Sequence, residues 1–208
     1  VVLGNEDAAN YDYTASVQYP FGYGLSYTDF EWSNYKVADK GDNYEVSVDV
    51  KNTGSVAGKD IVQIYMQSPY TEYDKEQGIE KASVQLVGYA KTDMLDAGAS
   101  ATVTVTVPKE QMKVYDANGY GTYIVDAGDY YFTAANNAHE AVNNILAAKG
   151  YSEAQGMDQA GNADQTSKVT VNEIDAKTYG SSQATGNEIS NQFEDVDIKK
   201  YDDSYQYL

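Results

Sequence analysis

The chain has 208 residues, which suffices for one large or two small domains with a hydrophobic core. Its 32 acidic residues outnumber 14 basic ones, all of them lysines, so the chain lacks both the basic patch and the arginine fork that nucleic acids require as a partner. The absence of cysteine excludes disulfides, thiolate zinc sites and cysteine nucleophiles, and no apolar run approaches the roughly 20 residues of a membrane span.

The first part of the chain predicts a junction followed by strands. We expect residues 1–24 to be the end of a preceding domain and a hinge, and residues 25–136 to form a β-sandwich. Residues 30–37 predict a strand with Phe30, Trp32 and Tyr35 pointing inward. Residues 44–51 alternate over four periods, which places Tyr44, Val46, Val48 and Val50 on a core face. The connection 52–58 leads to the apolar run 61–66, and the two runs together predict a hairpin.

The next elements complete an all-β pattern. A polar loop covers residues 68–81, a strand follows through 84–89, and the alternating run 100–107 is ended by Pro108, which has no N–H to donate to a ladder. Residues 121–125 and 128–134 predict two more strands around a turn. About seven short strands favour two packed sheets, in an immunoglobulin-like or fibronectin type III-like β-sandwich, with a small barrel as the alternative.

The last third changes character. Residues 137–150 predict one amphipathic helix, with Asn136 or Asn137 as its cap, Lys149 at its negative end and Gly150 as a left-handed stop. The apolar face of this helix consists of Ala138, Ala141, Val142, Ile145 and Leu146, and we expect it to pack on the sandwich or on a neighbouring domain. Residues 151–208 read as an extension or linker that is partly irregular, with one added strand near 167–174.

Catalytic and metal-binding residues are not expected in this chain. His139 is the only histidine, so neither a serine triad nor a common zinc site can be assembled, and we expect it on the helix surface or at the cap. The carboxylate pairs Glu76 and Glu80, and Asp195 and Asp197, lie in polar surroundings typical of solvated charge. The acidic segments 158–164 and 195–203 offer oxygen ligands but do not fit an EF-hand, and no cofactor is expected.

Tyrosine is abundant in the predicted loops. Its ring has an apolar face and a polar hydroxyl, which suits stacking on sugar rings, although the same residues can close the edges of a sandwich or anchor a domain interface. The candidates in or beside predicted loops are Tyr70, Tyr73, Tyr115, Tyr120 and Tyr123.

Four ordered segments resemble the fibronectin-like domain of family 3 β-glucosidases. Tyr19 to Phe30 resembles its entry motif, and Val46 to Tyr65 resembles its core segment with the asparagine-threonine-glycine turn. The other matches are Leu86 to Tyr89 followed by Leu95 to Gly98, and the turn from Val125 to Tyr130. The structural residues carried over by the resemblance are Pro20, Phe21, Gly22, Gly24, Leu25, Tyr27, Asn52, Gly54 and Gly58. Gly22 and Gly24 would adopt backbone angles closed to other residues, while Phe21, Leu25 and Tyr27 would pin the hinge to a core.

The resemblance implies a noncatalytic structural domain of a retaining β-glucosidase-like hydrolase. In such enzymes a barrel supplies an aspartate nucleophile and an α/β domain carries the acid/base glutamate, and no segment here matches either motif, so no catalytic residue is carried over. The implied partners are the flanking catalytic domains and their glucoside or oligosaccharide substrate, which a loop containing Tyr70, Tyr73 and Glu76 would face. Residues 185–193 resemble the linker of members with permuted domain order.

Two questions stay open at this point. The alternative function is an independent carbohydrate-binding or cell-surface adhesion module of similar fold. The compartment, bacterial cytoplasm or outside the cell, is not fixed by the sequence.

Overall fold

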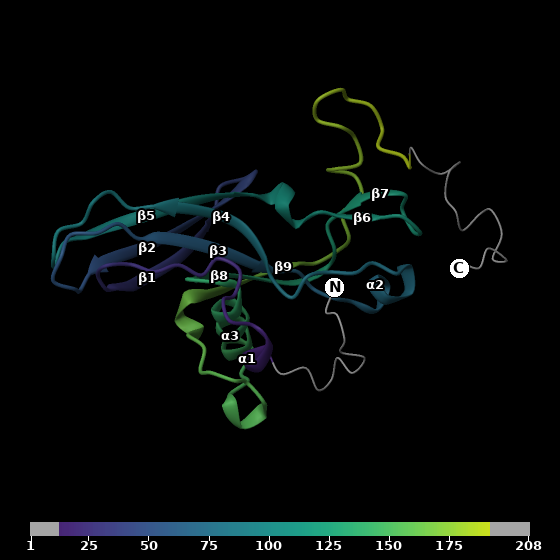
Figure 1. The fold of residues 1–208 in the computed structure, drawn as a ribbon. Coiled ribbons are helices and arrows are strands. Elements are labelled where there is room, and N and C mark those ends of the chain that lie inside the picture. The colour runs from purple at the N-terminus through teal and green to yellow at the C-terminus, as the bar shows by residue number, and fades with distance from the viewer. Residues whose placement is uncertain (1–12, 192–208) are drawn as a thin grey trace, which may run out of the picture. The chain divides into compact units, whose positions relative to one another are not determined.

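The computed structural model describes residues 13–191, which form a predominantly β-stranded protein (Figure 1). The strands are β1 (Phe30–Asp39), β2 (Asn43–Asn52), β3 (Ile61–Gln67), β4 (Gln85–Lys91), β5 (Ser100–Pro108), β6 (Val114–Asp116), β7 (Thr122–Ile124), β8 (Gly128–Ala135) and β9 (Thr166–Val171). The helices are α1 (Tyr13–Ser16), α2 (Glu72–Gln77) and α3 (Ala138–Ala148), with short 3₁₀ turns at Lys109–Met112, Glu153–Gln155 and Ala163–Gln165.

The strands build two main sheets and one small ribbon. One sheet has the order β1-β2-β5, the second has the order β4-β3-β8-β9, and β6 pairs only with β7. Strand β2 pairs antiparallel with β1 and β5, β3 pairs antiparallel with β4 and β8, and β6 pairs antiparallel with β7. The predicted β-sandwich is therefore confirmed, and the alternative of a small barrel is wrong because the strands belong to separate sheets.

The chain divides into two compact units. Within the part that the structure describes, unit 1 contains residues up to Ser68, Ala82–Pro108 and Tyr130–Val169. Within the same described part, unit 2 contains Pro69–Lys81, Lys109–Asp129 and residues 170–191. Unit 1 holds the two main sheets and α3, while unit 2 holds α2 and the β6-β7 ribbon.

The core of unit 1 follows from the two-residue period of its strands. Val46, Val48 and Val50 of β2 are all at most 1% exposed, as predicted, because alternate side chains of a strand share one face. The rings of Tyr44 and Phe132 lie 5.2 Å apart between their centroids, and Tyr35 donates a hydrogen bond of 2.7 Å to the carbonyl of Phe132. These contacts join the two sheets face to face.

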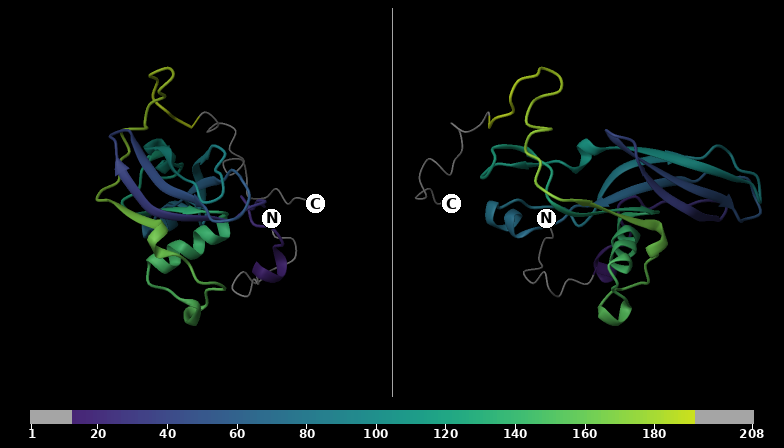
Figure 2. Two further views of the ribbon diagram at one scale, coloured as in Figure 1. Left: turned by 90° about the vertical axis from the view of Figure 1, so that its left-hand side faces the viewer. Right: turned by 180° about the vertical axis from the view of Figure 1, so that it is seen from behind.

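Strand β3 is buried on both faces, which explains why it is so apolar in sequence. Val62, Ile64 and Met66 face the sandwich core, whereas Tyr65 belongs to a second cluster with Ala135 and Ala141. Ala141 belongs to α3, so the predicted helix covers the other side of this sheet, as the two views of Figure 2 show.

The limits of α3 agree closely with the sequence prediction. The side chain of Asn137 caps its first turn by accepting the Glu140 N–H at 2.9 Å, and Gly150 has a φ of +89° just beyond its end. The buried face differs from the prediction, because Asn143 and Asn144 are almost fully buried while Val142 and Leu146 are only half-buried. Asn144 is satisfied by the carbonyl of Ala134 and by the N–H of Asn162.

Several predicted connections are wrong. β2 and β3 do not form a hairpin, because β2 pairs with β1 and β5 while β3 pairs with β4 and β8. β7 pairs with β6, a three-residue strand that the sequence pattern did not reveal, and not with β8. The segment 68–81 is not only a loop, because it contains α2. β9 overlaps residues 167–174, where alternation predicted an added strand.

Candidate functional site

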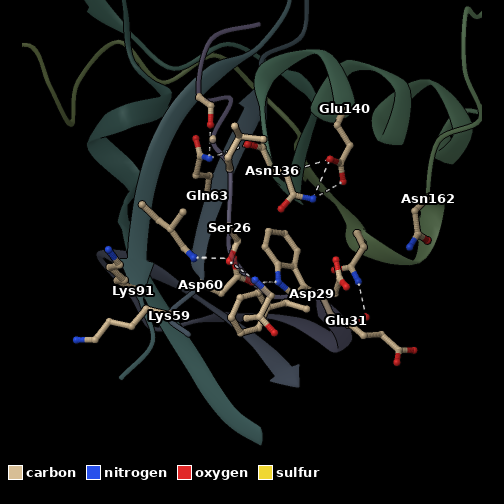
Figure 3. Close-up of a pocket in the computed structure, with 18 residues that line it drawn as sticks. Ser26, Asp29, Glu31, Lys59, Asp60, Gln63, Lys91, Asn136, Glu140 and Asn162 are labelled. Atoms are coloured by element: carbon tan, nitrogen blue, oxygen red, sulfur yellow. Dashed lines mark hydrogen bonds between the residues drawn. The ribbon is translucent and has the colours of Figure 1, made fainter. Parts of the chain in front are cut away.

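An open groove in unit 1 is the first candidate site (Figure 3). Its volume is about 770 Å³. Lys59 and Lys91 lie at one side of it, and Glu140 and Asn162 lie at the other. Aromatic rings of Phe30 and Trp32 contribute to its lining, together with Gly22, Gly24, Leu25, Ser26, Thr28, Asp29, Glu31, Asp60, Ile61, Gln63, Asn136 and Gln165.

One wall of the groove is formed by the hinge, which we define as Tyr19–Thr28. Gln63 of β3 holds it through its side-chain amide, which donates to the carbonyls of Gly22 at 2.9 Å and Asn136 at 2.8 Å. The backbone N–H of Ala138 donates to the carbonyl of Phe21 at 2.9 Å. The hydrogen bonds donated by Gln63 and Ala138 therefore fix the course of the hinge over the sheet.

Gly22 is required at its position for two reasons. Its φ is +84°, and a Cβ there would lie 2.3 Å from the Tyr65 hydroxyl and 2.4 Å from the Gln63 side-chain oxygen. This confirms the prediction for Gly22. The prediction for Gly24 is wrong, since Gly24 has no positive φ and nothing lies within 4 Å of where its Cβ would be.

Asn52 ties the far end of the hinge to the sandwich. Its side-chain oxygen accepts the Thr28 hydroxyl at 2.8 Å, and its amide donates to the carbonyls of Val56 at 2.8 Å and Leu95 at 2.9 Å. Gly54 is needed for close approach, because a Cβ would lie 2.1 Å from the Thr28 hydroxyl. The carried-over residues of this turn are thus structural.

The hinge exposes most of its large side chains. Leu25 is 88% exposed and Tyr27 is 100% exposed, so the expectation that they pin the hinge to a core of this chain is wrong. Phe21 is 66% exposed and is also not part of a core. Tyr19 and Tyr23 are exposed as well, with ring centroids 5.1 Å apart. A run of five exposed aromatic or aliphatic side chains along nine residues is unusual for a free surface.

The polar groups of the groove are suited to binding. Asp60 accepts the indole N–H of Trp32 at 2.5 Å and the N–H of Ile61 at 2.9 Å, so the indole is held in one orientation. Glu140 accepts hydrogen bonds from Asn136. Asp29 and Glu31 are exposed to solvent. No carboxylate pair here is held in the buried setting that acid/base catalysis uses.

The loop expected to face a sugar lies in unit 2. Tyr70 is 50% exposed and its ring lies 5.9 Å from the ammonium of Lys75. Tyr73 is half-buried and Glu76 is exposed, and both belong to α2. The structure brings Tyr73 and Glu76 to one helix face, because residues three apart in a helix are neighbours. Tyr70 precedes the helix cap and is engaged separately with Lys75.

A buried ion triad anchors this loop. The ammonium of Lys81 lies 2.8 Å from a carboxylate oxygen of Asp74 and 2.6 Å from one of Asp126. The three side chains are 8%, 0% and 1% exposed, respectively. Burial raises the pKa of Asp126, although the hydrogen bond and charge of Lys81 oppose the shift. Nothing in the sequence distinguished these two aspartates from the many solvated ones.

Asp116 is a second buried carboxylate of unit 2. It accepts the Tyr73 hydroxyl at 2.5 Å and the backbone N–H groups of Gly119 and Tyr120 at 2.8 Å each. Burial opposes ionisation of Asp116, but these hydrogen bonds outweigh it and lower its pKa. Desolvation, followed by the bond to Asp116, raises the pKa of Tyr73. Sequence reasoning missed Asp116, and the glycine three residues later in Asp-Ala-Asn-Gly was its only local signal.

The remaining sequence candidates have structural partners. His139 stacks on Tyr13 with ring centroids 4.1 Å apart, and its Nε2 lies 2.6 Å from Asp158. It lies on the surface of the first turn of α3, as predicted. Glu80 is exposed. Tyr115 and Tyr123 meet edge to face at 5.3 Å, and Lys113 lies over the Tyr123 ring. Asp195, Asp197 and the acidic segment 195–203 lie outside the described residues.

Residues 13–191 lack two other kinds of feature. No group of three or more His, Asp or Glu side chains in this range is placed to hold a metal ion. No helix in the same range has the length and apolarity needed to cross a membrane.

Comparison with known proteins links the chain to β-glucosidases. Residues 60–138 match the family model of the fibronectin type III-like domain. A β-glucosidase of Ruminococcus albus is 35% identical over 129 residues, which are 60% of this chain and 13% of that relative. The solved structure of a β-glucosidase from Paenibacillus barengoltzii is 30% identical with a TM-score of 0.53, and the match covers 74% of this chain and 15% of that chain.

A further solved structure shows the shared fold. The family 3 β-glucosidase of Bifidobacterium adolescentis has a TM-score of 0.57 at 23% identity, over 82% of this chain and 21% of that chain. The chain thus spans between about an eighth and a fifth of the length of these relatives and corresponds to one domain of larger polypeptides. On these matches, residues 60–138 form a fibronectin type III-like domain, and the chain is similar to a part of the β-glucosidases named above.

Proposed function

We propose that this chain is a noncatalytic structural domain that positions the catalytic domains of a β-glucosidase-like polypeptide. The observation that carries the proposal is the exposed hinge. Leu25 at 88% and Tyr27 at 100% exposure lie beside a groove of about 770 Å³, in the segment whose backbone is fixed by Gln63. A rigid, apolar and solvent-exposed segment suits a surface that another domain covers.

The energetics support docking at the hinge. Full burial of one large apolar side chain stabilises a protein by about 1.5–3 kcal/mol. Covering Leu25 and Tyr27 would therefore contribute several kcal/mol, part of which offsets the cost of ordering the domains relative to each other. The hinge backbone already follows a fixed course through its bonds to Gln63 and Ala138, so docking would not have to order it.

The chemistry would then come from the neighbouring domains. The relatives of Ruminococcus albus and Paenibacillus barengoltzii are named as β-glucosidases, so we propose β-linked glucosides as the substrates of the complete polypeptide. The role of the present domain is to hold the catalytic domains in register, because a misplacement of about 1 Å can cost a hundredfold in rate.

The test uses the complete polypeptide that contains this domain. Leu25→Asp and Tyr27→Asp should lower its thermal stability and its kcat on an aryl β-glucoside, because each places a charge in the proposed interface. Tyr89→Asp is the matched control, since Tyr89 is 66% exposed on β4 and outside the hinge. It should change neither quantity.

The isolated chain supplies a second readout. It should not hydrolyse the aryl β-glucoside, and a dye that reports exposed apolar surface should bind it less after Leu25→Asp. The proposal fails if the hinge variants leave the complete polypeptide as stable and active as the Tyr89→Asp control.

A further inference from the structure

One face of unit 2 presents an aromatic ring and a carboxylate together. Tyr73 and Glu76 lie three residues apart in α2 and share a helix face. The ring of Tyr120 lies 6.1 Å from that of Tyr73, at an interplanar angle of 46°. Tyr120 is 54% exposed and Glu76 is exposed. We call Tyr73, Glu76 and Tyr120 the tyrosine platform.

The platform is held in place before any ligand arrives. Asp116 is fully buried and binds both tyrosines, one through the Tyr73 hydroxyl at 2.5 Å and the other through the Tyr120 N–H at 2.8 Å. Gly119 packs against the same hydrogen-bonded group, because a Cβ there would come within 2.1 Å of the Tyr73 hydroxyl. A single buried carboxylate therefore holds the Tyr73 hydroxyl and the Tyr120 backbone.

Helix α2 is also fixed at both ends. At its start, Thr71 and Asp74 form a reciprocal capping box. At its end, Asn118 donates to the carbonyl of Gln77 at 2.6 Å. Asp74, in the first turn, is also joined through Lys81 to Asp126 in the buried triad. A binding surface that is already rigid loses little conformational entropy when a ligand binds.

The chemistry of the platform favours a neutral sugar ring. The faces of pyranose rings are apolar and pack on aromatic rings, while a carboxylate accepts hydrogen bonds from sugar hydroxyls. Helix α2 also carries the charged side chains of Glu72, Lys75 and Glu76, and charged residues are depleted at the core of protein interfaces. The excess of acidic groups disfavours an anionic ligand.

We propose that the tyrosine platform binds one ring of a neutral saccharide, with Tyr120 as the stacking surface and Glu76 as the hydrogen-bond acceptor. Tyr73 supports the Tyr120 ring, and its own hydroxyl is already donated to Asp116. Asp116 acts as a positioning residue that does not touch the sugar. This inference rests on the proposed function only in the choice of β-linked disaccharides as probes.

The experiment is a titration of the whole chain with cellobiose, followed by NMR of its tyrosine ring signals. We expect chemical-shift changes at Tyr120 and a dissociation constant on the order of millimolar, which corresponds to about 4 kcal/mol. Tyr120→Ala and Glu76→Gln should each weaken binding at least tenfold. Tyr89→Ala and Glu80→Gln are matched controls, because both residues are exposed and lie outside the platform, and they should leave the dissociation constant unchanged.

The positioning role of Asp116 has its own readout. Tyr73→Phe keeps the ring and removes only its hydroxyl, so it should weaken binding while the chain stays folded, and it should broaden the Tyr120 ring signal through added motion. Asp116→Asn should weaken binding and broaden the Tyr120 signal more strongly than Tyr73→Phe does. If Tyr73→Phe changes neither the affinity nor the Tyr120 signal, the positioning role is wrong.

The platform proposal is overturned if cellobiose, xylobiose and laminaribiose all fail to shift the Tyr120 signal, or if the two control variants lose affinity as much as Tyr120→Ala does. It is also overturned if the Tyr120 signal changes only when a flanking domain is present, because the surface is then a protein interface. None of these outcomes affects the hinge, whose variants Leu25→Asp and Tyr27→Asp test the proposed function separately.

Discussion

Replacing Lys81 should strongly destabilise unit 2. Lys81→Met removes the ammonium that lies 2.8 Å from Asp74 and 2.6 Å from Asp126, and these two carboxylates are 0% and 1% exposed. Methionine keeps the length of the side chain but leaves both acids buried without their cation. Removing one partner of a buried ion pair typically costs about 3–5 kcal/mol, because the remaining charge is desolvated and unpaired.

The assay is urea denaturation followed by circular dichroism, with a thermal melt as a second measure. A loss of about 3–5 kcal/mol corresponds to a fall in Tm of roughly 6–20 °C for a chain of this size. The control is Lys75→Met in α2, because Lys75 pairs with Glu72 at 2.6 Å on the surface and its loss should change stability little.

A double variant tests the reasoning directly. Asp126→Asn in the Lys81→Met background removes one of the two carboxylates that have lost their cation. The double variant should therefore lose less free energy of unfolding than the sum of the losses of the two single variants. The reasoning is refuted if Lys81→Met lowers the free energy of unfolding by less than about 1 kcal/mol, or if the two changes are strictly additive.

Three further predictions concern single groups. The pKa of Asp116 is lowered below 3.8, so the ionised carboxylate stabilises the folded chain above pH 3.8, and this stabilisation is lost as the pH falls through the pKa of the folded state. Asp116→Asn should therefore make the free energy of unfolding less dependent on pH at acidic pH. Burial, followed by the charge of Glu140, raises the pKa of Tyr65 from 10.0 to about 12, so the contribution of Tyr65 to stability is complete below pH 10.0 and falls as the pH approaches 12. Tyr65→Phe should therefore narrow the difference between the urea midpoints measured at about pH 8 and about pH 11. An unchanged difference would contradict this prediction. Asn52→Ala removes the side-chain donor to the carbonyls of Val56 and Leu95, of which Leu95 keeps the Gly58 N–H, and it removes the acceptor of the Thr28 hydroxyl. It should cost about 2–4 kcal/mol by urea denaturation, whereas Asn172→Ala at an exposed position should cost little.

The sequence predicted the strands better than their partners. The alternation of β2 and β5 is strict because one face of each strand meets the core, and the structure buries Val46, Val48, Val103 and Val105 accordingly. The predicted pairing of β2 with β3 was wrong, because it was inferred only from their nearness in the sequence. The connection after Asn52 instead crosses to the other sheet, and Gly58 along it bridges to Leu95.

The missed elements are short and polar. Helix α2 has six residues and no apolar stripe, so periodicity cannot reveal it, and its capping box of Thr71 and Asp74 is the only signal that the sequence offers. Strand β6 has three residues and depends on its pairing with β7. Such elements are stabilised by contacts and not by an intrinsic pattern.

The candidate site was predicted only in part. Tyr73 and Glu76 were identified as part of a loop facing a sugar, which stays a proposal, but Tyr70 does not share their helix face. The partner that places Tyr73 is Asp116, which lies 43 residues away in the sequence. A long-range hydrogen bond of this kind leaves no local pattern.

The sequence by itself determined the β-sandwich class, the helix α3, the need for glycine at position 22 and the likeness to family 3 hydrolases. Only the tertiary structure decided which acidic residues are buried and which hinge side chains are exposed. Asp74 and Asp126 become buried because Lys81 meets both of them, whereas Leu25 and Tyr27 stay exposed because the hinge is held through its backbone. Burial depends on what the rest of the chain brings near a residue, and residue type alone does not specify that.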